Sequence, residues 1–141
     1  MINNSVPMKP YIHKVRYYEC DGMGVTHHSN YIRFMEEARL DMQDQLGYGY
    51  EKMEEEGVIS PVVSVTCEYK RPTRFQDEIE IQVSLVEETP LRLGFAYDMR
   101  VGGKTVCKAT STHCFLERGR PVVFRERFPE FAKLLEQALK K

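Results

Sequence analysis

The spacing of apolar residues changes along this chain, and that change constrains the fold more than any other feature. In residues 31–46 the apolar side chains recur at helical spacing, with charged residues mostly on other faces. Across residues 63–116 apolar and polar residues alternate at a period of two, in segments separated by turn residues. The pattern predicts one long helix with a single buried face, followed by a series of strands.

The boundaries of these elements carry their own signals. Gly47 is placed to end the long helix, and Thr26 or Ser29 to cap its start. Gly102-Gly103 predicts a tight hairpin. The full set of expected elements is a strand at 11–18, the long helix, a short helical piece at 48–56, strands at 63–69, 79–85, 93–101 and 106–116, and a terminal helix at 128–139.

Short connections between successive strands predict an antiparallel sheet. A helix with one apolar face needs that face covered, so the sheet is expected to wrap it. We therefore expect an α+β fold, an antiparallel sheet wrapped around one long central helix. The length fits one domain over residues 1–141, with residues 1–10 as a loose lead-in.

Composition excludes several classes of protein. A net charge of −1 gives no support for binding nucleic acid. No apolar run approaches the roughly 20 residues that span a bilayer, and residues 1–14 lack the apolar stretch of a secretory signal, so we expect a cytoplasmic protein. The four cysteines match no zinc spacing and are expected to be reduced thiols, and no metal, nucleotide or flavin motif is found.

Residues 21–31, DGMGVTHHSNY, carry the strongest chemical signal. They place Asp21 in a glycine-bearing loop just before the long helix. The first backbone N–H groups of a helix lack internal partners and carry partial positive charge, so they can stabilise an oxyanion. The alternative is an ordinary turn, in which Asp21 bonds to the local backbone and His27 and His28 are polar residues of the first helical turn.

Residues 15–39 resemble the signature of the 4-hydroxybenzoyl-CoA thioesterase/YbgC-like family of hotdog-fold enzymes. The family pattern is an Asp, two residues, a Gly, three residues, a His or Tyr, two residues and a Tyr, followed by Phe-x-Glu-x-Ala-Arg. This chain fills it with Asp21, Gly24, His28, Tyr31, Phe34, Glu36, Ala38 and Arg39. Residues 67–79, CEYKRPTRFQDEI, resemble the family's strand and the Arg-Pro and Asp-Glu segment after it.

The resemblance implies a hotdog fold and an acyl-CoA thioesterase. Asp21 would be the catalytic carboxylate, either as nucleophile or as general base, and the sequence does not choose between these roles. The backbone N–H of His28 would stabilise the oxyanion, and its side chain would orient the thioester or water. No cofactor is implied, because CoA is part of the substrate.

The same resemblance implies the substrate contacts and the assembly. Contacts are expected from Gly24, Val25, His27, Asn30, Tyr31 and Arg71. His27 departs from the family, which commonly has an aromatic residue there. Lys70, Arg71 and Arg74 form a basic cluster that could meet the phosphates of CoA. A homodimer with the site at its interface, or a homotetramer built from such dimers, is implied.

Two other functions fit a hotdog domain. One is an acyl-thioester hydratase or dehydratase, although the spacing of Asp21 and His28 favours hydrolysis. The other is a non-catalytic domain that binds or senses acyl-CoA. Glu36 and Glu37 diverge by about 100° on a helix, so at most one can face a site, and we expect both in solvent or at an interface. His113 is expected to be a packed or interface residue.

Overall fold

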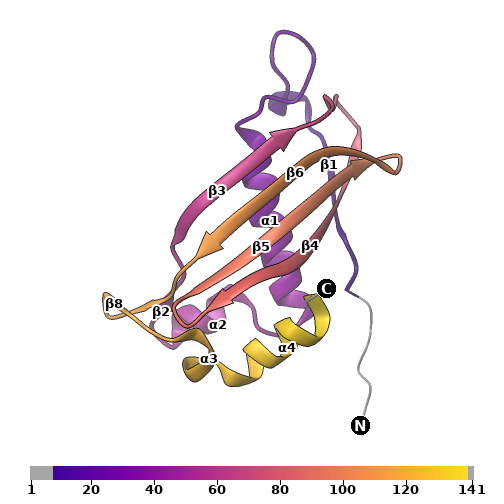
Figure 1. Cartoon of the computed structure of the whole chain (residues 1–141). Coiled ribbons are helices and arrows are strands. Elements are labelled where there is room, and N and C mark those ends of the chain that lie inside the picture. Colours follow the sequence, from indigo (N-terminus) through magenta and orange to yellow (C-terminus); the bar gives the residue numbers. More distant parts are fainter. Residues whose placement is uncertain (1–7, 140–141) are drawn as a thin grey trace.

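The computed structural model describes residues 8–139, in which one long helix lies against an antiparallel sheet of five strands (Figure 1). The sheet order is β1-β4-β5-β6-β3. These elements are β1 Tyr11–Lys14, α1 Asn30–Gln45, β3 Val62–Tyr69, β4 Glu78–Thr89, β5 Arg92–Val101 and β6 Lys104–His113. The expected α+β arrangement is confirmed. Residues 1–7 of the expected lead-in lie outside the described residues.

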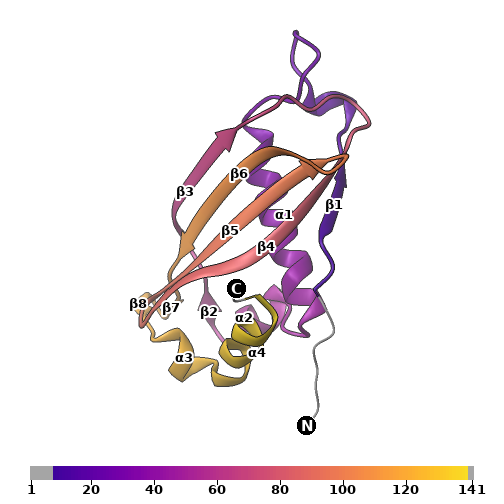
Figure 2. The same ribbon diagram turned by 45° about the vertical axis from the view of Figure 1, so that its right-hand side comes forward.

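Smaller elements gather at the end of the sheet opposite the start of α1 (Figure 2). A second sheet has the order β2-β7-β8. Its strands are β2 Val58–Ile59, β7 Leu116–Glu117 and β8 Arg120–Pro121, and the helices near them are α2 Tyr50–Glu55, α3 Phe124–Arg127 and α4 Pro129–Leu139. Together they extend the core past the end of α1.

The long helix forms where the apolar spacing predicts it. Its buried stripe includes Phe34, Met35 and Met42, each at most 3% exposed. At its C-terminus Gly47 has a φ of 78°, and the N–H of Tyr48 reaches back to the carbonyl of Gln43 at 2.9 Å. This is the Schellman arrangement, so the predicted role of Gly47 is confirmed.

The sheet covers that stripe with alternating residues. Ile79, Ile81, Val83 and Leu85 of β4 are all buried, as a period of two requires. Gly102 and Gly103 have φ values of 58° and 79°, which suit a two-residue hairpin. The predicted strand faces and hairpin are confirmed.

Two predicted elements are wrong in their extent. The first strand ends at Lys14, and a 3-10 turn follows at Tyr17–Glu19. Alternation in a strand at 11–18 would place Tyr17 on the same face as buried Val15, but Tyr17 is 76% exposed. The turn forms because the Glu19 carboxylate accepts the Arg16 N–H at 2.8 Å. The strand predicted at 106–116 ends at His113, and Leu116 belongs to the separate strand β7. The terminal helix predicted at 128–139 is confirmed as α4, which begins at Pro129, whereas the short helix α3 before it was not predicted.

Within residues 8–139, no helix combines the length and the apolar character that crossing a membrane requires. All four cysteines are free thiols, and Cys107 is fully buried.

Candidate active site

An open cavity of about 380 Å³ lies beside the start of α1, and we call it the Asp21 pocket. Its walls come from the loop before α1 and from the end of β3. The lining residues are Asp21, Met23, Val25, Thr26, His28, Tyr31, Tyr69, Lys70, Arg71 and Pro72. The fold therefore brings together five of the eight residues expected from the sequence to act in catalysis or to contact substrate, namely Asp21, Val25, His28, Tyr31 and Arg71, with Lys70 of the basic cluster beside them.

The Asp21 carboxylate is held at one oxygen and open at the other. Its Oδ1 accepts the backbone N–H of Met23 at 2.8 Å, which is the local turn bond considered above. Among residues 8–139 no hydrogen bond uses Oδ2. The N–H of Asp21 donates to the carbonyl of Val25 at 2.9 Å and so closes the loop, in which Gly24 has a φ of 79°. The turn thus orients the carboxylate while leaving one oxygen for a ligand.

His28 lies in the turn that leads into α1. Its carbonyl accepts the N–H of Tyr31 at 3.2 Å, and within the described chain no hydrogen bond uses its own backbone N–H. Its ring stacks on that of His27 with centroids 4.3 Å apart. His27 itself is exposed and bonded to Ser29, and it does not line the pocket. The unused N–H at this position is the kind of donor that can stabilise an oxyanion.

Beneath the loop, three side chains tie it to the end of β3. Thr73 is fully buried, and its hydroxyl lies 2.6 Å from that of Thr26 and 2.9 Å from that of Tyr31. The N–H of Thr26 also donates to the Thr73 carbonyl at 2.8 Å. Sequence reasoning missed Thr73, and its place directly after Arg71-Pro72 in the second family-like segment was the available signal.

Asn30 holds the loop from the other side. It is buried, and its Nδ2 donates to the carbonyl of Glu19 at 2.9 Å and of His27 at 3.3 Å. It does not line the pocket, and neither does Gly24. The backbone of Glu19 is therefore an anchor for the loop that carries His27 and His28.

The side chain of Glu19 belongs to a buried polar cluster. His13 contacts Glu19 through Nε2 at 2.8 Å and Glu37 through Nδ1 at 3.2 Å. The Tyr11 hydroxyl donates a hydrogen bond to Glu37 at 2.7 Å. Burial is the larger cause of the raised pKa of this phenol, and the hydrogen bond to Glu37 is the next. The Glu37 side chain is 41% exposed, which agrees in part with the expected solvated position, but its hydrogen bonds to His13 and Tyr11 inside the subunit were not predicted. Sequence analysis gave no role to His13 or Glu19.

The basic cluster divides between the pocket and the surface. Lys70 and Arg71 line the Asp21 pocket and are exposed, so they present positive charge at its mouth. Arg74 does not line it, and its backbone N–H donates to Asp77 at 2.8 Å. Within the described residues no group of three His, Cys, Asp or Glu side chains is arranged to hold a metal.

A sheet wrapped around one helix, with a loop-borne carboxylate at the helix start, defines a hotdog-fold protein of the thioester hydrolase class. A model of the thioesterase-like superfamily matches residues 15–137, and the chain belongs to that superfamily. The hotdog fold and the thioester hydrolase class expected from the sequence are thereby confirmed.

Individual relatives agree over most of the chain. YneP of Bacillus subtilis, whose name provisionally assigns it as an acyl-CoA thioesterase, is 32% identical over 130 residues, 90% of this chain and 94% of YneP. The crystal structure of a hypothetical protein from Aquifex aeolicus is 32% identical, with a TM-score of 0.84 over 89% of this chain and 98% of that one. The crystal structure of the DHNA-CoA thioesterase of Staphylococcus aureus has a TM-score of 0.84 and a sequence 26% identical to this one, over 89% of this chain and 87% of that chain.

Proposed function

We propose that this protein hydrolyses acyl-CoA thioesters to a free acid and CoA, with Asp21 as the catalytic carboxylate. One observation carries the proposal: the Asp21 carboxylate and the turn into α1 at His28 line the same open cavity as Lys70 and Arg71. The names of YneP and of the Staphylococcus aureus enzyme support CoA esters as the substrate class.

In the proposed reaction the thioester carbonyl lies between Asp21 and the His28 backbone N–H. Asp21 either attacks the carbonyl, forming a mixed anhydride and expelling the CoA thiolate before water cleaves the anhydride, or removes a proton from the attacking water. In both routes the N–H of His28 donates to the developing oxyanion. The His28 side chain orients the thioester or the water. No metal or cofactor takes part.

The remaining contacts divide by chemistry. Arg71, with Lys70, meets the phosphates of CoA at the mouth of the pocket, because a guanidinium matches phosphate geometry. Val25 and Tyr31 provide apolar surface beside the thioester. Gly24, His27 and Asn30 shape the loop around the substrate, through the backbone turn, the stacked ring and the buried amide respectively.

We further propose that the enzyme is a homo-oligomer whose site is completed across a dimer interface. In the described chain β3 is an edge strand, and Val62 and Val63 on it are 48% and 41% exposed. Leu40 on α1 is also exposed, at 39%. Unpaired strand edges with apolar side chains favour pairing with a second copy. Light scattering coupled to size-exclusion chromatography measures the molar mass of the assembly. An enzyme that is active as a monomer would contradict the proposed dimer.

The test of the activity is hydrolysis of a panel of short-chain, long-chain and aromatic acyl-CoAs by the wild type and by Asp21→Asn. We expect kcat to fall by about 10²–10⁴-fold in the variant, the usual contribution of a catalytic acid or base. Asp44→Asn, an exposed carboxylate near the other end of α1, is the matched control and should retain activity. Loss of thioester absorbance is the better readout, because three of the protein's own free cysteines are partly exposed and would compete for a thiol reagent.

Three outcomes would contradict the proposal in different ways. Full activity of Asp21→Asn would remove Asp21 from the chemistry. Binding of CoA esters without hydrolysis would favour a sensor domain. Loss of an enoyl-CoA with its thioester intact would favour a hydratase.

A further inference from the structure

Two exposed arginine-aromatic dipeptides lie side by side near the Asp21 pocket, and none of their residues lines it. Arg16-Tyr17 follows β1, and Arg74-Phe75 precedes β4. The N–H of Gln76 donates to the carbonyl of Val15 at 2.9 Å, and the N–H of Val15 donates to the carbonyl of Asp77 at 2.9 Å. These bonds continue the antiparallel pairing of β1 with β4 past the ends of both strands, and so bring the two dipeptides together.

The two aromatic rings contact each other but stay open to solvent. Their centroids are 5.6 Å apart and their planes meet at 80°. Tyr17 is nevertheless 76% exposed and Phe75 is 49% exposed. Aromatic side chains that gather on a surface without being covered mark a binding site more often than single exposed residues do. The perpendicular arrangement leaves ring surface on which a further flat ring can stack.

The arginines beside the rings have no ion-pair partner inside the described chain. Arg16, Arg71 and Arg74 are exposed, and none of the salt bridges within residues 8–139 includes them. The acidic residue of the same turn, Glu19, is buried and bonded to His13, so its carboxylate does not face these guanidinium groups. Unpaired guanidinium groups at a surface favour a phosphate ligand.

Both dipeptides are connected to the Asp21 pocket by short stretches of chain. Phe75 follows Arg71, at the mouth of the pocket, by four positions, which span at most about 14 Å even when fully extended. Tyr17 precedes Asp21 by four positions, and the turn between them is closed by the N–H of Cys20 on the carbonyl of Tyr17 at 3.1 Å. A ligand whose phosphates bind at Arg71 can therefore extend to the two rings.

We propose that Tyr17 and Phe75 bind the adenine ring of CoA and that Arg16 and Arg74 pair with its 3′-phosphate. This subsite rests on the proposed function, because it takes the nucleotide end of the thioester whose acyl end lies at Asp21. Adenine offers a flat face that stacks on aromatic side chains, and a guanidinium matches the geometry of a phosphate. An acyl group on a carrier protein has no adenine, so the subsite favours thioesters of CoA.

Binding of the nucleotide alone tests the subsite without any reaction. The probe is adenosine 3′,5′-bisphosphate, titrated into the full chain and followed by saturation-transfer NMR on the adenine protons. Tyr17→Ala and Phe75→Ala are expected to weaken its binding at least about fivefold, and Tyr17→Phe, which keeps the ring, to bind it as the wild type does. Tyr18→Ala is the matched control, since Tyr18 is also 76% exposed. Arg74→Gln is expected to weaken binding of the bisphosphate but not of adenosine 5′-monophosphate.

Kinetics test the same subsite in the substrate. For an acyl group that the enzyme hydrolyses, the ratio of kcat/KM on the CoA ester to kcat/KM on the pantetheine ester is expected to fall at least about fivefold in Tyr17→Ala and in Phe75→Ala. Tyr18→Ala is expected to keep the wild-type ratio.

The outcomes separate this inference from the proposed function. Nucleotide binding that is weakened in Tyr17→Ala and Phe75→Ala, in a protein that hydrolyses no thioester, would support the subsite and contradict the thioesterase. Hydrolysis with the same preference for CoA esters in every variant would support the thioesterase and overturn the subsite. The subsite is also overturned if the wild type does not bind the bisphosphate, or if Tyr17→Ala changes the molar mass of the assembly while nucleotide binding stays the same.

Discussion

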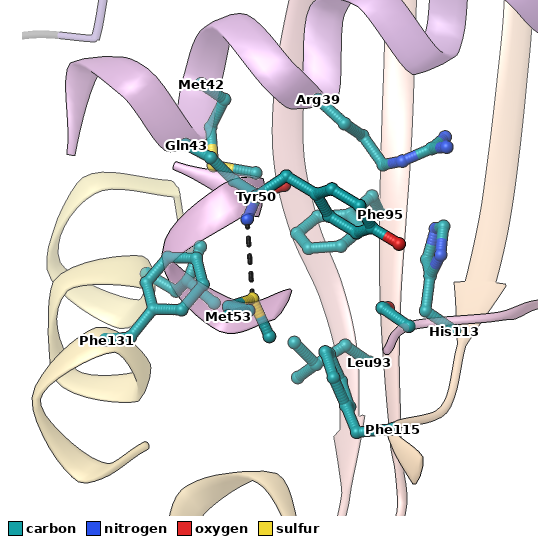
Figure 3. Close-up of a pocket in the computed structure, with 12 residues that line it drawn as sticks. Arg39, Met42, Gln43, Tyr50, Met53, Leu93, Phe95, His113, Phe115 and Phe131 are labelled. Carbon is teal, nitrogen blue, oxygen red and sulfur yellow. Dashed lines mark hydrogen bonds between the residues drawn. The ribbon is translucent and has the colours of Figure 1, made fainter. Parts of the chain in front are cut away.

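The Asp21 pocket differs in its construction from a second cavity farther along α1, the Arg39 cavity, which Arg39, Tyr50 and His113 line together with apolar residues such as Met53 and Phe131 (Figure 3). The Asp21 pocket is made by loops and a strand end, and its charged residues are reached from solvent. The Arg39 cavity is made by helices and strands of the core, and its polar residues are linked by a chain of hydrogen bonds inside the subunit. One site presents charge to solvent, and the other keeps it under the surface.

The difference shows where each site gets its rigidity. A carboxylate that must meet a large thioester has to be reachable, so the Asp21 loop cannot be fixed by burying its catalytic group. Instead it rests on buried neighbours, Glu19 with His13 on one side and Thr73 with Tyr31 on the other. The Arg39 cavity needs no such support, because the core elements that line it are already packed. Mutations should therefore separate the support of the first site from the walls of the second.

The largest effect on stability is expected from removing the support under the Asp21 loop. Glu19→Ala leaves buried Nε2 of His13 and the Arg16 N–H without their partner, and each hydrogen-bonding group left unsatisfied in this way costs about 1–3 kcal/mol. The Glu19 carboxylate also holds the 3-10 turn whose backbone anchors the loop, so kcat should fall as well. Urea unfolding and steady-state kinetics measure the two effects.

Glu37→Ala is the matched control, since Glu37 contacts the same histidine but its side chain is 41% exposed. The hydrogen bonds of Glu37 to His13 and Tyr11 are only partly buried, so water can take the place of the carboxylate, and the variant should lose less stability, about 0.5–1.5 kcal/mol for each bond. Equal losses from the two variants would show that the cluster does not support the loop through Glu19 in particular.

Next in size is the effect of opening the core around the Arg39 cavity. Met53 is 1% exposed, and Met53→Ala should reduce the free energy of unfolding by about 2–5 kcal/mol, as other large-to-small core changes do. Met23, at 80% exposed in the Asp21 pocket, is its counterpart, and Met23→Ala should stay within about 0.5 kcal/mol. If the two variants were equally stable, the contrast between a core-built and a loop-built site would be wrong.

A smaller effect concerns the pH dependence of stability. In the folded protein the pKa of His113 is lowered from 6.5 to about 4, so between these values the unfolded chain takes up the proton and the folded chain does not. The free energy of unfolding therefore falls as pH falls through this window. His113→Gln removes this titration and should flatten the dependence between pH 6.5 and about 4. Parallel curves for variant and wild type would show that His113 titrates alike in both states.

Much of the architecture could be predicted because periodicity and turn residues are local signals. The apolar stripe of α1, the alternation in β4 and the paired glycines at 102 and 103 each specify their element without help from the rest of the chain. The first strand was predicted too long because the side chain of Glu19 closes a turn there, and alternation alone does not show that bond.

The candidate site was predictable where its residues stand close together in one segment of the sequence. Asp21 and His28 stand out because a carboxylate, glycines and a helix start occur together in one segment. The residues that support them do not stand out in the sequence. Thr73 is separated from Thr26 by 47 positions, and His13 from Glu37 by 24. Contacts of that separation depend on how the sheet wraps the helix. For the same reason Arg39 could be assigned to a motif but not to a cavity.

The smallest effect is expected from Tyr31→Phe, which tests the second support of the Asp21 loop. The ring of Tyr31 is 3% exposed, and its hydroxyl is bonded to that of Thr73, so the phenylalanine variant keeps the packing and loses one buried hydrogen bond. Such a loss costs about 1 kcal/mol, because Thr73 retains its bond to Thr26. We expect kcat to change only a few-fold, because in this arrangement the hydroxyl faces Thr73 and the substrate meets the ring. Urea unfolding and acyl-CoA hydrolysis give both values. A loss of activity as large as that of Asp21→Asn, at unchanged stability, would mean that the Tyr31 hydroxyl contacts the reacting thioester and does not merely support the loop.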